Sequence, residues 1–85
     1  MTISHVKIIG SGLIGTSIGL ALALKNIGVS MHDIDSRAQG LARDLVKSPS
    51  TNPVDLVIFA LPINSLHSLL DSEFANNPKA CFIDI

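Results

Sequence analysis

Short apolar runs alternate along this chain with longer segments whose apolar residues recur at helical spacing. The short runs predict strands, which we place over residues 5–9, 29–33, 54–60 and 79–85. The longer segments predict helices, which we place over residues 13–26, 37–47 and about 64–72. Strands and helices therefore alternate from the first apolar run to the last.

This alternation predicts the fold class. A βαβαβαβ order favours an α/β domain, a Rossmann-like doubly wound parallel sheet of about four strands with helices on both faces. Right-handed crossovers place the second strand outside the first, and the third and fourth strands on the other side of the first. Ligands of such sheets bind outside the carboxyl ends of the strands, where the two halves of the sheet diverge.

Residues at the expected boundaries refine these limits. Ser36 is the expected N-cap of the second helix, and Gly28 marks the end of the first. Gly15 and Gly19 lie one helical turn apart, where small residues permit close approach to the sheet. The Asn-Asn-Pro sequence at 76–78 predicts a turn before the last strand.

The composition indicates a compact domain with more apolar surface than it can bury. Of the 85 residues, 47% are hydrophobic and only 15% are charged, which excludes disorder and favours a sheet covered on both faces. A domain of this size buries only somewhat more than ~60% of the surface of its unfolded chain. We therefore expect part of the surface to meet a second copy in a homo-oligomer, or a missing C-terminal domain that covers the sheet edge.

Charge and residue usage exclude several classes of partner. The formal net charge is −1 and the chain has no Trp or Tyr, so neither nucleic acid nor a membrane is an expected partner. The single cysteine, Cys81, lies in an apolar run, and we expect a buried small hydrophobe in a protein of the reducing cytoplasm. His5, His32 and His67 match no metal-ligand spacing, so no metal is expected.

The most informative motif is a G-x-G-x-x-G sequence, Gly10-Ser11-Gly12-Leu13-Ile14-Gly15. Strand, glycine turn and helix in that order are the context that the dinucleotide-binding fingerprint requires. Gly10 turns the chain sharply, Gly12 leaves room for a pyrophosphate, and Gly15 lets the helix pack tightly on the strand. The N–H groups of Leu13 and Ile14, at the positive end of the helix, then hold the phosphate charge.

An acidic residue follows at the spacing expected for contact with the adenosine ribose. Asp33 lies 18 residues after the last glycine of the motif, close to the ~20 that is typical. A carboxylate here accepts hydrogen bonds from the ribose hydroxyls and repels a 2′-phosphate, which favours NAD over NADP. Arg37 is the residue that could contact a 2′-phosphate instead, Asp35 is expected in a turn or helix start, and Ser11 and Thr16 could each offer a hydroxyl to phosphate.

Four landmarks, taken in order, make the chain similar to the N-terminal NAD(P)-binding domain of prephenate/arogenate dehydrogenases. They are IGSGLIGTSI at 9–18, HDID at 32–35, DLVIFALP at 55–62 and FID at 82–84. Together they cover nearly the whole chain. The Gly-Leu-Ile-Gly core, followed by a small residue and Ser17, is the most specific of them.

The resemblance implies a nicotinamide-dependent oxidative decarboxylation of prephenate or arogenate in tyrosine biosynthesis. It carries the family's dinucleotide positions onto the glycine motif, Asp33 and Leu61. The family's catalytic histidine, its substrate-binding residues and its helical dimerisation domain lie beyond the strand that ends at Asp84. We therefore expect residues 1–85 to be a truncated cofactor-binding domain without a catalytic residue of its own.

Other functions stay open on the residues alone. One is a regulatory module that senses nucleotides without chemistry. Another is the cofactor half of a different enzyme, such as an imine or β-hydroxyacid reductase or a flavoprotein, although a flavin enzyme usually carries Glu where this chain has Asp33. The segment 47–53 is short for a dinucleotide fold, which often has an extra edge strand there, and this departure affects one wall of the adenine site.

Overall fold

The computed structural model describes residues 3–10, 12–60, 71–73, 75–77 and 79–85 of the chain. Its elements are β1 (His5–Ile9), α1 (Leu13–Ala23), β2 (Gly28–His32), α2 (Ser36–Val46), β3 (Leu56–Phe59) and β4 (Cys81–Asp84). Residues 71–73 and 75–76 are also helical. The predicted alternation of strands and helices is therefore present through α2, and the part of the predicted third helix at 64–70 lies outside the described residues.

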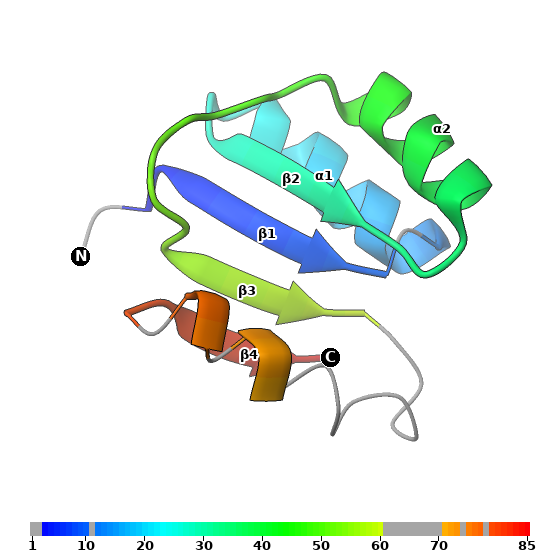
Figure 1. Ribbon diagram of the computed structural model, residues 1–85. Coiled ribbons are helices and arrows are strands. Elements are labelled where there is room, and N and C mark those ends of the chain that lie inside the picture. Colours follow the sequence, from blue (N-terminus) through cyan, green and yellow to red (C-terminus); the bar gives the residue numbers. More distant parts are fainter. Residues whose placement is uncertain (1–2, 11, 61–70, 74, 78) are drawn as a thin grey trace.

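The four strands form one parallel sheet in the order β2-β1-β3-β4, which confirms the predicted fold class and strand order. Figure 1 shows α1 behind the sheet, α2 on the β2 side next to α1, and the short helical turns of residues 71–73 and 75–76 in front of the sheet. The register places Ile8 of β1 between Met31 of β2 and Ile58 of β3. All four strands end at the same edge of the sheet, where a doubly wound fold binds its ligand.

The core has one layer on each face of the sheet. Beneath α1 and α2, the central strand β1 buries Val6 and Ile8 against residues of the neighbouring strands and of both helices. A Cβ added at Gly19 would lie 3.0 Å from Met31 Sδ, so α1 reaches the sheet closely only because this residue has no side chain. On the opposite face, Phe59 is buried and stacks on Phe82 with ring centroids 6.1 Å apart.

A polar network closes the amino-terminal edge of the sheet. The Asp55 carboxylate accepts hydrogen bonds from the backbone N–H groups of Ser4 and His5, at 2.8 and 3.1 Å, and from the Ser4 hydroxyl. The buried His5 ring donates from Nδ1 to Asn52 O and hydrogen-bonds Ser30 Oγ through Nε2, each at 2.6 Å. These bonds tie the starts of β1 and β3 to the segment that joins α2 to β3.

The outer edge of β2 is protected without a further strand. No strand is assigned between residues 47 and 55, all of which are described. Instead, Ser48 O accepts the Val29 N–H at 2.7 Å, and Arg43 Nε donates to Met31 O at 3.0 Å. Loop and side-chain atoms thus satisfy edge groups that a sheet otherwise exposes to unwanted pairing.

Several predicted boundaries differ from the structure. Helix α1 ends at Ala23 rather than at 26, because the chain turns through Asn26 at φ 61°, and Gly28 belongs to β2. Asp35, not Ser36, caps α2, since its carboxylate accepts hydrogen bonds from two N–H groups of the first turn. The strands β3 and β4 are shorter than the apolar runs that predict them, and residue 76, expected in a turn, is helical.

The expectation of a buried Cys81 is wrong. This residue begins β4 and is exposed. In register it pairs with Leu56, so it faces the same side of the sheet as α1 and α2. Those helices pack on β1 and β2, in the other half of the sheet, and neither of them covers the β4 end of this face.

The Asp55 network makes a prediction about pH. Its hydrogen bonds, above all that from the Ser4 backbone N–H, hold the pKa of the Asp55 carboxyl below its ordinary value. A depressed pKa adds stability above the pKa of the unfolded chain, about 4, and that stability is lost as the pH falls through the folded value. We expect Asp55→Asn to lower the free energy of unfolding at pH 7, with the difference from wild type shrinking below about pH 4.

Urea unfolding of both proteins at a series of pH values measures this difference. Asp44→Asn, at an exposed position on α2, removes a carboxylate without these hydrogen bonds and is the control. A difference between wild type and Asp55→Asn that stays constant from pH 7 to about 3 would contradict the role given to the carboxylate.

Candidate functional site

The predicted glycine turn begins where β1 ends. Gly10 follows Ile9 with φ 104°, a left-handed conformation that side chains other than glycine rarely adopt. Its N–H donates to the carbonyl oxygen of His32 at 2.7 Å. That bond joins the turn to the end of β2, so the two strand ends meet here.

Helix α1 starts directly after the turn, and its N-cap residue makes no side-chain capping hydrogen bond. Gly12 is the N-cap residue in an extended conformation, and its carbonyl accepts the first helical bond from the Thr16 N–H at 2.9 Å. The first turn contains no acidic residue. The N–H groups of Leu13 and Ile14 are therefore at the positive end of the helix, where an anion is favoured.

Gly12 and Gly15 differ in the space around them, as the motif predicts. A Cβ added at Gly12 would meet nothing within 4 Å, and the residue is exposed. A Cβ added at Gly15 would collide with the carbonyl oxygen of Gly10 and lie 3.4 Å from Ala60 Cβ. The turn is thus open toward solvent at Gly12, and Gly15 lets α1 close against the carbonyl that leaves β1.

Asp33 lies at the same edge as the glycine turn. It follows the last residue of β2, His32, whose carbonyl holds the Gly10 N–H. The Asp33 Oδ1 accepts the Asp35 N–H at 2.8 Å, and the Asp33 N–H donates to Gln39 Oε1 at 2.9 Å. These bonds orient a half-buried carboxylate at the carboxyl end of β2, next to the strand end from which the turn departs.

The structure describes some of the other predicted site residues but not all of them. Leu13 and Ile14 are 86% and 66% exposed at the start of α1. Asp35 is the N-cap of α2, which confirms its expected place, and Arg37 is exposed in the first turn of that helix. Three predicted positions lie outside the described residues: Ser11, Leu61 and His67.

Two contacts near the site were not predicted. Gln39 and Arg43 lie one turn apart on α2, and both reach the end of β2, at Asp33 N and Met31 O respectively. Their spacing of four residues indicates a shared helix face, but only the position of α2 over β2 shows which backbone atoms they meet. They hold the strand end that presents Asp33.

At the carboxyl edge of the sheet, the His32 imidazole is neutral and has charged side chains around it. Burial first, and then the positive charges of Lys7 and Arg43, lower the pKa of His32 below its ordinary value, so the ring is neutral at pH 7. Lys7 itself forms an ion pair with Glu73 at 2.6 Å, and the two side chains are only 14% and 8% exposed. This pair fastens the helical residues 71–73 to the face of the sheet opposite α1 and α2.

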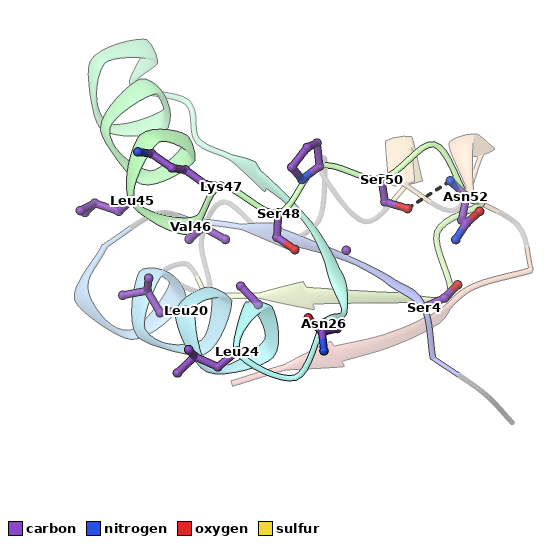
Figure 2. Close-up of a pocket in the computed structure, with 13 residues that line it drawn as sticks. Ser4, Leu20, Leu24, Asn26, Leu45, Val46, Lys47, Ser48, Ser50 and Asn52 are labelled. Carbon is purple, nitrogen blue, oxygen red and sulfur yellow. Dashed lines mark hydrogen bonds between the residues drawn. The ribbon is translucent and has the colours of Figure 1, made fainter.

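The cavities found among the described residues lie away from the glycine turn. The larger, about 810 Å³, is at the other end of the sheet, between the carboxyl ends of α1 and α2 and the segment 47–52 (Figure 2). The smaller, about 360 Å³, follows the outer edge of β2 and contains the His32 and Arg43 side chains in its lining. Neither is lined by Gly10, Gly12 or Asp33; of these three, Gly12 is exposed, Asp33 is half-buried and Gly10 is buried.

Comparisons of the sequence with known protein families and with curated proteins identify no relative. No model of a known protein family matches the sequence, and no curated protein matches it. Within the described part of the chain, no group of three His, Cys, Asp or Glu residues could hold a metal ion. Over the same residues, no helix has the length and apolar character needed to cross a membrane.

The unequal space at the two glycines predicts unequal effects on stability. We expect Gly15→Ala to lower the free energy of unfolding by on the order of 3 kcal/mol, because the new Cβ must displace backbone. Gly12→Ala, with open space around the Cβ, should cost about 1 kcal/mol or less, the usual range for a change of N-cap residue. Denaturant unfolding of both variants measures this, and equal losses would argue against the tight approach at Gly15.

Proposed function

We propose that this chain is the NAD(P)-binding domain of an oxidoreductase similar to prephenate dehydrogenase, with NAD as the preferred cofactor. The observation that carries the proposal is the amino end of α1, where the N-cap residue Gly12 has no side chain and is open to solvent, at the carboxyl edge of the sheet near Asp33. A glycine turn without these neighbours is an ordinary strand-to-helix connection.

The residues present fit a dinucleotide. The open side of Gly12 lets a pyrophosphate approach the backbone, and the N–H groups of Leu13 and Ile14 would hold its charge. The Asp33 carboxylate, oriented by the Asp35 N–H, would accept hydrogen bonds from the adenosine ribose. The nicotinamide ring of the bound cofactor accepts a hydride from the substrate.

The reaction class is supported by the resemblance alone. The four landmarks at 9–18, 32–35, 55–62 and 82–84 favour the oxidative decarboxylation of prephenate or arogenate. On this resemblance the chain binds the cofactor in the cytoplasm and carries no catalytic residue of its own. The groups that bind the substrate and remove its hydride would come from outside residues 1–85.

Isothermal titration of the purified chain with NAD and with NADP tests the proposal. We expect both to bind, NAD more tightly, with a dissociation constant below about 1 mM. The assignment would be overturned if neither NAD nor NADP produced a binding heat at millimolar concentration and neither competed with the other.

Substitution at the open glycine should weaken binding. We expect Gly12→Val to raise the dissociation constant for NAD about 10-fold or more, because the side chain fills the space that the pyrophosphate needs. Gly40→Val is the matched control, since Gly40 is also exposed with open space around its Cβ but lies on α2. Equal affinity of the folded Gly12→Val protein and this control would count against the glycine turn as the phosphate site.

Removal of the Asp33 carboxylate, which would bind the ribose, should alter the preference between NAD and NADP. We expect Asp33→Ala to weaken NAD binding about 10-fold and NADP binding less, because the 2′-phosphate no longer meets a negative charge. Asp44→Ala, an exposed carboxylate on α2, is the control for net charge. The ratio of the two dissociation constants is the readout, and an unaltered ratio would remove Asp33 from the site.

A further inference from the structure

Helix α1 is apolar on its outer face as well as on the face that meets the sheet. Its eleven residues include no charged side chain. Gly15 and Gly19 are buried against the sheet, whereas Leu13, on the opposite side, and the C-cap residue Leu24 are 86% and 85% exposed. A helix that is apolar all round is normally enclosed, so this outer face is suited to a partner.

Exposed residues of α2 extend the same surface. Leu45 joins Leu20 and Leu24 in lining the larger cavity, and Figure 2 shows these three side chains together at one side of it, with Ser50 and Asn52 at the other. We call the combined surface the outer helix patch. Its members are Leu13, Ile14, Leu20, Leu24, Leu41 and Leu45.

The outer helix patch is large for a monomer of this size. Its six side chains are 86, 66, 39, 85, 58 and 62% exposed in that order, which is equivalent to about four fully open side chains. Together these six residues expose on the order of 600 Å², close to the ~800 Å² that each partner contributes to a standard interface.

The spacing along α1 favours a second copy of the same helix. Leu13, Ser17, Leu20 and Leu24 follow one another at intervals of four, three and four, so they form one stripe. That spacing is the same in both directions. When two such helices pair antiparallel, Leu13 lies opposite Leu24 of the other copy, and Ser17 lies opposite its Leu20.

The size and chemistry of these residues suit that pairing. The small Ser17 faces the larger Leu20, which lets the two helices approach closely. Its hydroxyl already donates to Leu13 O at 2.7 Å, so burial would leave it satisfied. Leu13 of the other copy would lie beside Leu24, at the apolar wall of the larger cavity, and no like charges on α1 oppose the contact.

We propose that the outer helix patch is a symmetric interface through which two copies of this chain form a dimer, with their α1 helices antiparallel. The contact is isologous, because each copy supplies both the exposed Leu13 and the surface that receives it. The dimer does not rest on the proposed function, because it uses the side chains of Leu13 and Ile14, whereas cofactor binding would use their backbone N–H groups.

Sedimentation velocity of the purified chain tests the dimer. We expect wild type to sediment as a dimer at about 10 µM, and Leu24→Lys to raise the dissociation constant about 100-fold or more by placing two charges in an apolar contact. Ile34→Lys is the matched control, since Ile34 is 99% exposed and outside the patch, and it should remain dimeric. Both positions are so exposed that circular dichroism should show unchanged helix content.

A wild-type chain that stays monomeric at about 1 mM would overturn the proposal, as would equal dissociation of the two lysine variants. Disulfide cross-linking then tests the register, in a Cys81→Ser background that removes the exposed native thiol. The antiparallel pairing predicts covalent dimers from the double variant Leu13→Cys/Leu24→Cys under mild oxidation, and none from Leu24→Cys alone. Efficient cross-linking of the single variant would indicate parallel helices and refute the arrangement proposed.

Discussion

The structure depends on how closely α1 approaches the sheet. Gly15 lies against the carbonyl oxygen of Gly10, and Gly19 lies against side chains of Met31 and Val46, so neither position has room for a larger residue without a shift. This contact holds the helix start beside the end of β1. Ile18 and Leu22 pack on the core beside these glycines, and Leu13 and Leu20, on the other side of α1, are exposed. The candidate anion site and the outer helix patch therefore follow from the same packing constraint.

The amino and carboxyl edges of the sheet, where the strands begin and end, differ in how their polar groups are used. At the amino edge, Asp55 and His5 use their hydrogen-bonding groups within the protein, holding together the starts of β1 and β3 and the link from α2. At the carboxyl edge, the backbone leaves β1 through a left-handed glycine and enters a helix whose N-cap residue, Gly12, has no side chain. Groups already paired stabilise a fold, whereas an uncapped helix start is suited to hold a charged ligand. This contrast is why the function proposed lies at the Gly12 edge and not in the larger cavity.

Much of the fold and part of the site could be predicted from sequence. Apolar runs identify buried parallel strands, and the glycine spacing identifies the turn that Gly10, Gly12 and Gly15 form. Helix ends were harder, because Asp35 and Ser36 are both good N-caps and only the path of the chain decides between them. The predicted burial of Cys81 was wrong for a related reason. An apolar run shows that a strand is present, but it does not show whether a helix covers that part of the sheet.

By itself the sequence determined the order of elements, the parallel sheet and the location of the glycine turn, because these depend on local periodicity and on residues without side chains. Tertiary structure alone decided what lies beside that turn. Asp33 is brought to it by the pairing of β1 with β2, and Gln39 and Arg43 reach the strand end only because α2 packs there. It also decided that Leu13 and Leu24 face outward with Leu45, since exposure is a property of how layers stack and not of any one segment.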